Sequence, residues 1–161
     1  MIISLIGMPG CGKTSIGKEL ALKLDMDFLD IDQFIEKNYQ SIDSLFAVSE
    51  AHFREIESKA LKECLLQDNT VLSTGGGIIL SKKNRELLRK HSSVFFINRE
   101  IDDIIASTDF TDRPLLKNNS SKIHELYRNR IDKYYETAHY IINSNNVFDD
   151  TINKILQNID K

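Results

Sequence analysis

Residues 5–17 of the chain read LIGMPGCGKTSIG. Within this stretch, the segment from Gly7 to Thr14 fits the spacing of one Gly, four residues of any kind, then Gly, Lys and Ser or Thr. An apolar run over residues 2–6 precedes the segment and predicts a buried strand. Apolar side chains then recur at every fourth position up to residue 24, which predicts a helix over residues 13–24. The motif therefore lies between a strand and a helix, which is the context that it requires.

A loop with this composition binds phosphate groups mainly through its backbone. Glycines leave the space, and permit the backbone angles, that let successive N–H groups point at phosphate oxygens. Lys13 adds a positive charge toward the β- and γ-phosphates, the hydroxyl of Thr14 is a ligand for Mg²⁺, and the positive end of the helix completes the anion site. An ordinary glycine-rich turn with an incidental lysine is the alternative. The residues expected to contact the nucleotide are Gly10, Cys11, Gly12, Lys13, Thr14 and Ser15.

The composition predicts one globular domain. With 161 residues, of which 41% are hydrophobic and 28% charged, the chain is long enough to bury a full core. Its net charge of -3 gives no general electrostatic reason to bind nucleic acid or an acidic membrane. Cys11 and Cys64 lie far apart, and the sequence shows neither a secretory leader pattern nor an apolar run of roughly 18 residues. We expect a reduced, cytoplasmic protein, with residues 1–161 as one domain and no nucleic-acid or membrane partner.

Strand and helix patterns alternate along the chain. Short apolar, β-branched runs predict strands over residues 2–6, 28–31, 70–72, 93–97 and 140–142. Helical patterns cover residues 13–24, 43–66, 81–91, 121–138 and 149–159, and the second is expected to break near Ser49, which would cap a new helix. This alternation predicts an α/β fold with a parallel sheet between two layers of helices. Residues 108–121 are rich in Asp, Thr, Asn and Ser and predict a surface loop.

Two carboxylates follow the second predicted strand. Asp30 and Asp32 are two residues apart, so on a continuous strand they would point to the same face. The carboxyl edge of an open parallel sheet is where such folds bind ligands. One carboxylate would hold the hydration shell of Mg²⁺, and the other would orient or deprotonate an attacking hydroxyl. The alternative is that Asp30 only ends the strand and Asp32 caps the next helix.

Two further patterns suggest contacts with a small acidic ligand. Arg54 and Glu57 are i, i+3 on a predicted helix, so the acid can orient a guanidinium whose fork matches a carboxylate. Residues 75–77 are three glycines directly after a buried strand, which indicates a close backbone approach to a ligand. The alternatives are a solvated helix charge for Arg54 and a flexible turn for the glycines.

Two more arginines are candidates. Arg113 lies in the polar loop of residues 108–121, where it would cover a transferring phosphoryl group and neutralise developing charge. Arg130 shares one helical face with Tyr134 and Ala138. A surface charge over a tyrosine is the alternative for Arg130.

The rest of the chain narrows the class of nucleotide-binding protein. A GTPase switch would need a guanine-reading Asn-Lys-x-Asp segment, which the sequence lacks, and motor or transporter ATPases are normally longer. Phosphoryl transfer to a small acceptor therefore fits best. The remaining alternatives are a kinase acting on gluconate or on a nucleoside monophosphate, and a nucleotide-dependent switch without turnover.

In their order along the chain, these motifs resemble those of shikimate kinases, a family within the nucleoside-monophosphate-kinase-like phosphate-loop proteins. After the phosphate loop, the marks are residues 30–32, residues 53–54 with Glu57, the turn of Thr74 and the three glycines 75–77, residues 113–116, and Arg130 with Tyr134 and Ala138. The resemblance implies a three-layer α/β/α fold whose five-stranded parallel sheet has the order 2-3-1-4-5. It also implies transfer of the γ-phosphoryl group of ATP to the 3-hydroxyl of shikimate, with Mg²⁺, on the route to aromatic amino acids. We expect a monomer, because nothing in the sequence suggests an obligate partner.

The resemblance also implies a role for each candidate. The catalytic residues would be Lys13, Asp32 and Arg113; the Mg²⁺ residues would be Thr14 and Asp30; the shikimate residues would be Asp32, Arg54, Gly76, Gly77 and Arg130. Residues 32–61 would form the substrate-binding region and residues 108–121 the lid.

The chain departs from the family where adenine is expected to bind. Many members carry an arginine seven residues before the position of Arg113, whereas this chain has Ala106 there. The lid segment 108–112 has no lysine, and residues 143–149 lack an Arg-x-Pro-like contact. We therefore expect normal phosphate binding and a looser hold on the base, through Phe110 or the backbone.

Overall fold

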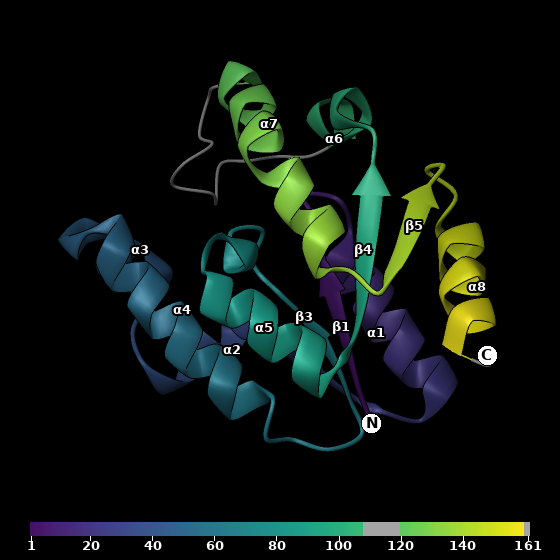
Figure 1. Cartoon of the computed structure of the whole chain (residues 1–161), viewed down its shortest axis with the longest axis horizontal. Helices are drawn as coiled ribbons and strands as arrows, with labels where there is room; N and C mark the ends of the chain where they lie inside the picture. The colour runs from purple at the N-terminus through teal and green to yellow at the C-terminus, as the bar shows by residue number, and fades with distance from the viewer. Residues whose placement is uncertain (108–119, 160–161) are drawn as a thin grey trace.

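The computed structural model describes residues 1–107 and 120–159. The strands within them form one parallel sheet in the order β2-β3-β1-β4-β5, as expected (Figure 1). The strands are β1 (Ile2–Ile6), β2 (Asp27–Asp30), β3 (Thr70–Ser73), β4 (Ser93–Arg99) and β5 (Tyr140–Ser144). All lie within two residues of their predicted positions.

Helices cover both faces of this sheet. They are α1 (Lys13–Leu24), α2 (Ile31–Asn38), α3 (Ile42–Val48), α4 (Glu50–Cys64), η1 (Ile78–Leu80), α5 (Lys82–His91), α6 (Ile101–Ser107), α7 (Ser120–Thr137) and α8 (Phe148–Ile159). In Figure 1, α5 and α7 lie in front of the sheet, and α1 lies behind it and packs with α8. The α2–α4 segment lies beside the β2 edge. The three-layer α/β/α fold is confirmed.

The helix predicted over residues 43–66 is broken where the sequence indicated. Ser49 separates α3 from α4, and its hydroxyl accepts a hydrogen bond from the backbone N–H of His52 at 3.0 Å. Two short helices, α2 and α6, were not predicted, because each is too short to give a clear helical period. Most of the expected loop over residues 108–121, with Phe110 and Arg113, lies outside the described residues; residues 120 and 121 begin α7.

The prediction that Asp30 and Asp32 share one face of a strand is wrong. β2 ends at Asp30, and Ile31 already begins α2. The carboxylate of Asp30 accepts hydrogen bonds from the backbone N–H groups of Asp32 and Gln33, so Asp30 is the N-cap of the helix. Asp32 instead lies in the first turn. Because Asp30 caps the helix, the strand ends one residue earlier than the apolar pattern predicted.

The core surrounds β1, the central strand. Its residues Ile3, Leu5 and Ile6 are fully buried, as both faces of a parallel strand covered by helices require. In register, Leu5 and Asp30 are both level with Ser73 of β3. The three strands therefore end at one level, and the loops that follow them leave the same edge of the sheet side by side.

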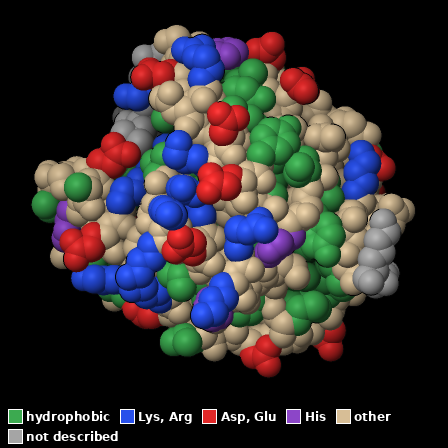
Figure 2. Space-filling model, viewed as in Figure 1, with side chains coloured by type: hydrophobic (Ala, Val, Ile, Leu, Met, Phe, Trp, Pro, Cys, Tyr) green, Lys and Arg blue, Asp and Glu red, His purple; other side chains and the backbone are tan. Residues whose placement is uncertain are grey.

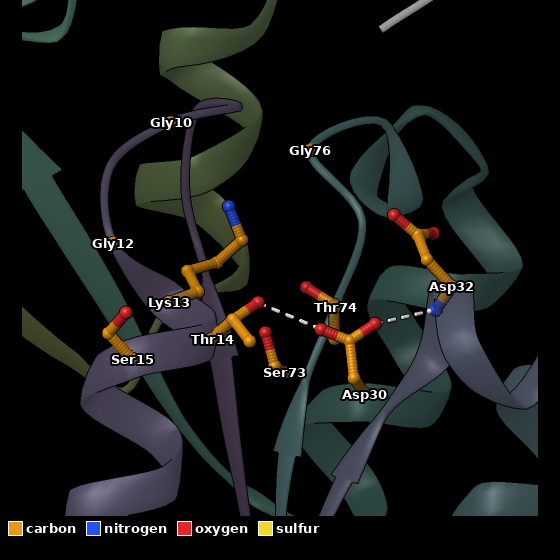
Figure 3. A pocket seen from close by; sticks show the side chains of 10 residues that line it. All are labelled: Gly10, Gly12, Lys13, Thr14, Ser15, Asp30, Asp32, Ser73, Thr74 and Gly76. Atoms are coloured by element: carbon orange, nitrogen blue, oxygen red, sulfur yellow. Dashed lines mark hydrogen bonds between the residues drawn. The ribbon is translucent and has the colours of Figure 1, made fainter. Parts of the chain in front are cut away.

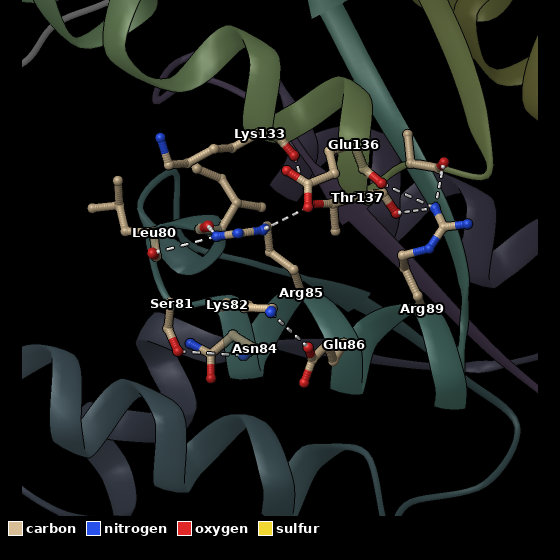
Figure 4. Close-up of polar contacts among 12 residues, drawn as sticks. Leu80, Ser81, Lys82, Asn84, Arg85, Glu86, Arg89, Lys133, Glu136 and Thr137 are labelled. Atoms are coloured by element: carbon tan, nitrogen blue, oxygen red, sulfur yellow. Dashed lines mark hydrogen bonds and ion pairs between the residues drawn. The ribbon is translucent and has the colours of Figure 1, made fainter.

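Helix α5 fixes the position of two neighbouring elements, the end of α7 and η1 (Figure 4). Arg89 donates from one guanidinium nitrogen to the carbonyls of Glu136, Thr137 and Ala138 at 3.0–3.2 Å. These carbonyls at the end of α7 thereby gain a hydrogen-bond donor. Arg85 donates to the carbonyl of Ile79 in η1 at 2.8 Å. Because α7 and η1 border the glycines of residues 75–77, these contacts hold the surroundings of that turn.

Basic side chains gather on the face that carries α4, α5 and α7, with acidic side chains between them (Figure 2). Some of these basic side chains form ion pairs with the acidic ones: Arg85 lies 3.7 Å from Glu136, and Lys82 lies 3.9 Å from Glu86. Within the described residues, no helix combines the length and the apolar character needed to cross a bilayer.

Replacement of Arg89 by alanine is expected to lower the free energy of unfolding by about 1 kcal/mol, because the carbonyls at the end of α7 lose a charged donor. Urea denaturation followed by circular dichroism measures this. Lys90→Ala is the matched control, since Lys90 is the next residue on α5 and is exposed. Equal losses in the two variants would contradict the capping role.

Candidate active site

The phosphate loop connects β1 to α1 in the predicted position. Gly12 is the N-cap of α1 with φ 97°, a left-handed conformation that residues with a side chain rarely adopt. No side chain caps this end of the helix. The first N–H groups of α1 therefore face the loop and suit an anion, as the positive end of the helix dipole does.

Lys13 lies across this loop, and only 7% of the residue is exposed. Its ammonium donates to the carbonyls of Gly7 at 2.8 Å and Met8 at 3.0 Å, and lies 3.6 Å from the sulfur of Cys11. These contacts hold the charge beside the loop. A phosphate chain bound there would meet a cation already in place.

Thr14 and Asp30 bring a hydroxyl and a carboxylate together. The Thr14 hydroxyl donates to Oδ2 of Asp30 at 2.8 Å, while Oδ1 of the same carboxylate caps α2 (Figure 3). Mg²⁺ prefers hard oxygen ligands and usually takes only one or two from the protein, with water and phosphate oxygens completing its octahedron. The two side chains therefore fit such an ion.

A pocket of about 210 Å³ opens between these groups. Figure 3 shows the phosphate loop on one side of it, Asp32 on the other, and Gly76 at the rim. The lining residues are Gly10, Gly12, Lys13, Thr14, Ser15, Asp30, Asp32, Ser73, Thr74 and Gly76. The fold thus gathers residues from the ends of β1, β2 and β3 around one pocket. Ser73 and Thr74 were missed; the signal for them was a pair of polar residues between a buried strand and three glycines.

Arg54 is placed by a carboxylate and a glycine. Its Nη1 donates to Oε1 of Glu57 at 2.9 Å, as the i, i+3 spacing predicted. The guanidinium lies against Gly77, where an added Cβ would come within 2.4 Å of both terminal nitrogens. No side chain fits at residue 77 without moving Arg54. Arg54 is thus built into the turn and is not a solvated helix charge.

Gly76 joins three elements. Its carbonyl accepts a hydrogen bond from the fully buried Tyr134 hydroxyl of α7 at 2.5 Å, and an added Cβ would lie 2.6 Å from Pro9 of the phosphate loop. The glycine turn is therefore packed between α7 and the phosphate loop. This arrangement contradicts the alternative of a flexible turn.

Arg130 is buried on α7, with 3% of the residue exposed, so the surface-charge alternative is wrong. Burial raises the pKa of Tyr134 and of Glu57, and the charge of Arg130 acts in the opposite direction on both. Arg54 pairs with Glu57, which lies with Asp32 against Gly75, and Arg130 is one helical turn from Tyr134, which binds the neighbouring Gly76. Two cations and two acids around one small space suit a ligand that carries both a carboxylate and hydroxyl groups.

The carboxylate of Glu57 is almost fully buried, and its Oε2 has no hydrogen-bond partner among the described residues. Burial raises the pKa of Glu57 above its usual 4.5, while the Arg54 ion pair opposes this shift. Glu57 thus orients Arg54, and the burial of its carboxylate away from water lowers the stability of the fold.

Comparison with known proteins identifies similar chains. A family model described as "Shikimate kinase" matches residues 9–160. The shikimate kinase of Clostridium botulinum strain Alaska E43 is 42% identical over 160 residues, covering 99% of this chain and 94% of the relative. That of Dictyoglomus turgidum is 36% identical over 151 residues, covering 89% of this chain and 88% of the relative.

Solved structures agree. Shikimate kinase from Acinetobacter baumannii in complex with shikimate superposes with a TM-score of 0.93 at 35% identity, over 98% of this chain and 92% of that one. The Aquifex aeolicus enzyme gives a TM-score of 0.87 at 28% identity, over 99% and 96%.

Glu57→Gln should change how stability depends on pH. Because the folded pKa of Glu57 is raised, the native state holds this proton more tightly than the unfolded chain, so stability falls as pH rises above about 4.5. The Gln variant has no such carboxyl group and does not lose this stability. The difference in the free energy of unfolding, variant minus wild type, should therefore increase with pH, by a total of about 1.4 kcal/mol for each unit by which folding raises the pKa of Glu57. Urea denaturation between pH 4 and 8 measures it, with exposed Glu55→Gln on the same helix as control. A difference that does not vary with pH would contradict the raised pKa.

Proposed function

We propose that this chain, which belongs to the shikimate kinase family, transfers the γ-phosphoryl group of ATP to the 3-hydroxyl of shikimate. The products are ADP and shikimate 3-phosphate, on the route to aromatic amino acids. The observation that carries the proposal is the position of two arginines suited to a carboxylate around the glycine turn at the rim of the phosphate-loop pocket. Arg54 lies against Gly77, and the buried Arg130 is one helical turn from Tyr134, whose hydroxyl donates to the carbonyl of Gly76. A kinase for an uncharged sugar would have no use for such a pair.

The donor half of the site binds the triphosphate. The backbone N–H groups of the loop and of the first turn of α1 surround the phosphates, and Lys13 places its charge toward the β- and γ-phosphates. Thr14 and Asp30 would hold Mg²⁺, directly or through its water. When bound, this ion neutralises charge on the β- and γ-phosphates.

The acceptor half holds shikimate. Arg54 and Arg130 bind its carboxylate, Gly76 and Gly77 allow its ring to approach the backbone, and Asp32 accepts a hydrogen bond from the reacting hydroxyl. As the 3-oxygen forms its bond to the γ-phosphorus, Asp32 takes the hydroxyl proton and the bond to the β-γ bridging oxygen breaks, releasing ADP. Arg113, outside the described residues, is assigned to the transferring phosphoryl group on the family resemblance alone.

We extend the proposal to the organisation of the protein. Residues 1–161 form one kinase domain, in which residues 32–61 are the substrate-binding region and residues 108–121 the lid. The enzyme acts as a cytoplasmic monomer on small molecules, without a nucleic-acid or membrane partner.

A coupled assay of ADP release tests the proposal. The acceptors are shikimate, gluconate and several nucleoside monophosphates, each with Mg²⁺ and ATP. Turnover is expected with shikimate and not with the others. Turnover with gluconate or a monophosphate in its place, or with no acceptor at all, would contradict the proposed function.

Asp32→Asn should lower kcat by roughly 10²–10⁴-fold, the usual contribution of a general base, and leave the affinity for ATP nearly unchanged. The amide keeps the size of the side chain but cannot accept the proton. Asp27→Asn, an exposed position on β2, is the matched control and should retain full activity. Preserved turnover in Asp32→Asn would remove this residue from the chemical step.

A further inference from the structure

A second polar network lies at the carboxyl edge of the sheet, outside the pocket described above. Arg99, the last residue of β4, donates from Nε to Oδ1 of Asn146 at 2.7 Å, and its Nη1 lies 3.4 Å from the carbonyl of Gly10 in the phosphate loop. The amide of Asn146 donates in turn to Oδ2 of Asp103 on α6 at 2.8 Å. The network therefore links the phosphate loop, the loop between β5 and α8, and α6.

The strand order determines which part of ATP reaches this network. The acceptor groups lie over β2 and β3, on one side of β1. The γ-phosphate must point to that side to be transferred. The nucleoside end of the same molecule must then leave the phosphate loop on the opposite side, over β4 and β5. Arg99 and Asn146 lie at the ends of those strands, next to Gly10.

We infer that Arg99 contacts the nucleoside end of ATP and that Asn146 is the residue that positions it. The inference rests on the proposed function, since it takes ATP to be the phosphoryl donor. A guanidinium is flat, remains charged, and packs its face on an aromatic ring while its edge makes hydrogen bonds. Asn146 engages Nε, and Gly10 is within reach of Nη1, so one edge of the guanidinium is held.

Three observations indicate that the position of the Arg99 side chain is fixed by the fold and is not an incidental surface contact. Arg99 is half-buried although it is a charged residue at a strand end. Asn146 has φ 65°, a left-handed conformation that asparagine tolerates better than most residues. The side-chain amide of Asn146 is held at both ends: its nitrogen donates to Asp103, and its oxygen accepts from Arg99. The orientation of the guanidinium is thus set from three elements.

A cation packed on a ring does not read the hydrogen-bonding edge of a base. The inference keeps the expectation of normal phosphate binding, and it assigns the hold on the base to Arg99 in place of Phe110 or the backbone. Arg99→Ala should weaken ATP and GTP alike.

Isothermal titration calorimetry of the intact protein with Mg²⁺ tests the inference, using ATP and inorganic tripolyphosphate as probes and no acceptor. Arg99→Ala should weaken ATP binding by about tenfold and leave tripolyphosphate binding unchanged. In steady-state assays the KM for ATP should rise, while the KM for shikimate stays the same. Unchanged ATP affinity, or an equal loss for tripolyphosphate, would overturn the inference, because the second result would mean that Arg99 only supports the phosphate loop.

Further variants separate contact from positioning. Asn146→Ala should weaken ATP binding less than Arg99→Ala does, and should add no further loss when Arg99 is already alanine. Additive losses would overturn the positioning role of Asn146. Arg128→Ala removes an exposed guanidinium from α7 and should bind ATP as wild type does.

Arg99→Lys keeps the charge without the flat fork and should fall between wild type and alanine. It also serves as the test if Arg99→Ala fails to fold, which thermal melts would reveal; wild-type affinity in the Lys variant would then overturn a role for the guanidinium plane. Because calorimetry needs no acceptor, these results do not depend on turnover of shikimate, and failure of the proposed function would be seen separately in the acceptor assay.

Discussion

Every part of the proposed active site depends on the insertion of β3 between β1 and β2 in a parallel sheet. Parallel strands present their carboxyl ends at one edge, and the register makes Leu5, Ser73 and Asp30 level with one another. The three loops that follow therefore begin side by side. One is the loop that we propose binds the phosphates, one leads from Asp30 to Asp32, and the third is the glycine turn between them. A different strand order would place the same motifs apart.

The glycine turn makes this arrangement rigid. Tyr134 donates to the carbonyl of Gly76, Pro9 occupies the space where a side chain of residue 76 would be, and the guanidinium of Arg54 occupies the space where a side chain of residue 77 would be. α4, which carries Arg54, and α7, which carries Arg130, are thereby both held to the glycine turn, and Pro9 connects that turn to the phosphate loop. Positioning of this kind is the main source of catalysis in phosphoryl transfer, in which the protein contributes little covalent chemistry.

How far sequence predicts these features depends on how local they are. The phosphate loop is contiguous, and Arg54 and Glu57 lie one helical turn apart, so both could be read from spacing. The parallel sheet between two layers of helices followed from the alternation of strands and helices, whereas the strand order came from the family resemblance. The contact of Arg54 with Gly77 is tertiary and leaves no local pattern. Asp32 was misplaced on the strand because capping of α2 by Asp30 competes with continuation of the strand, and spacing alone does not decide between them. The contacts of Arg99, which we infer to meet ATP, could not be predicted, because a single arginine at a strand end belongs to no motif.

The central claim is that a triphosphate site and a site for a hydroxylated acid meet at one edge of the sheet. A crystal structure with shikimate and a non-hydrolysable ATP analogue tests it most directly. The account predicts the carboxylate of shikimate on Arg54 and Arg130, its 3-hydroxyl beside Asp32, and the γ-phosphate facing that hydroxyl from the phosphate loop. Shikimate bound away from the phosphate loop, or with its carboxylate turned away from both arginines, would contradict it.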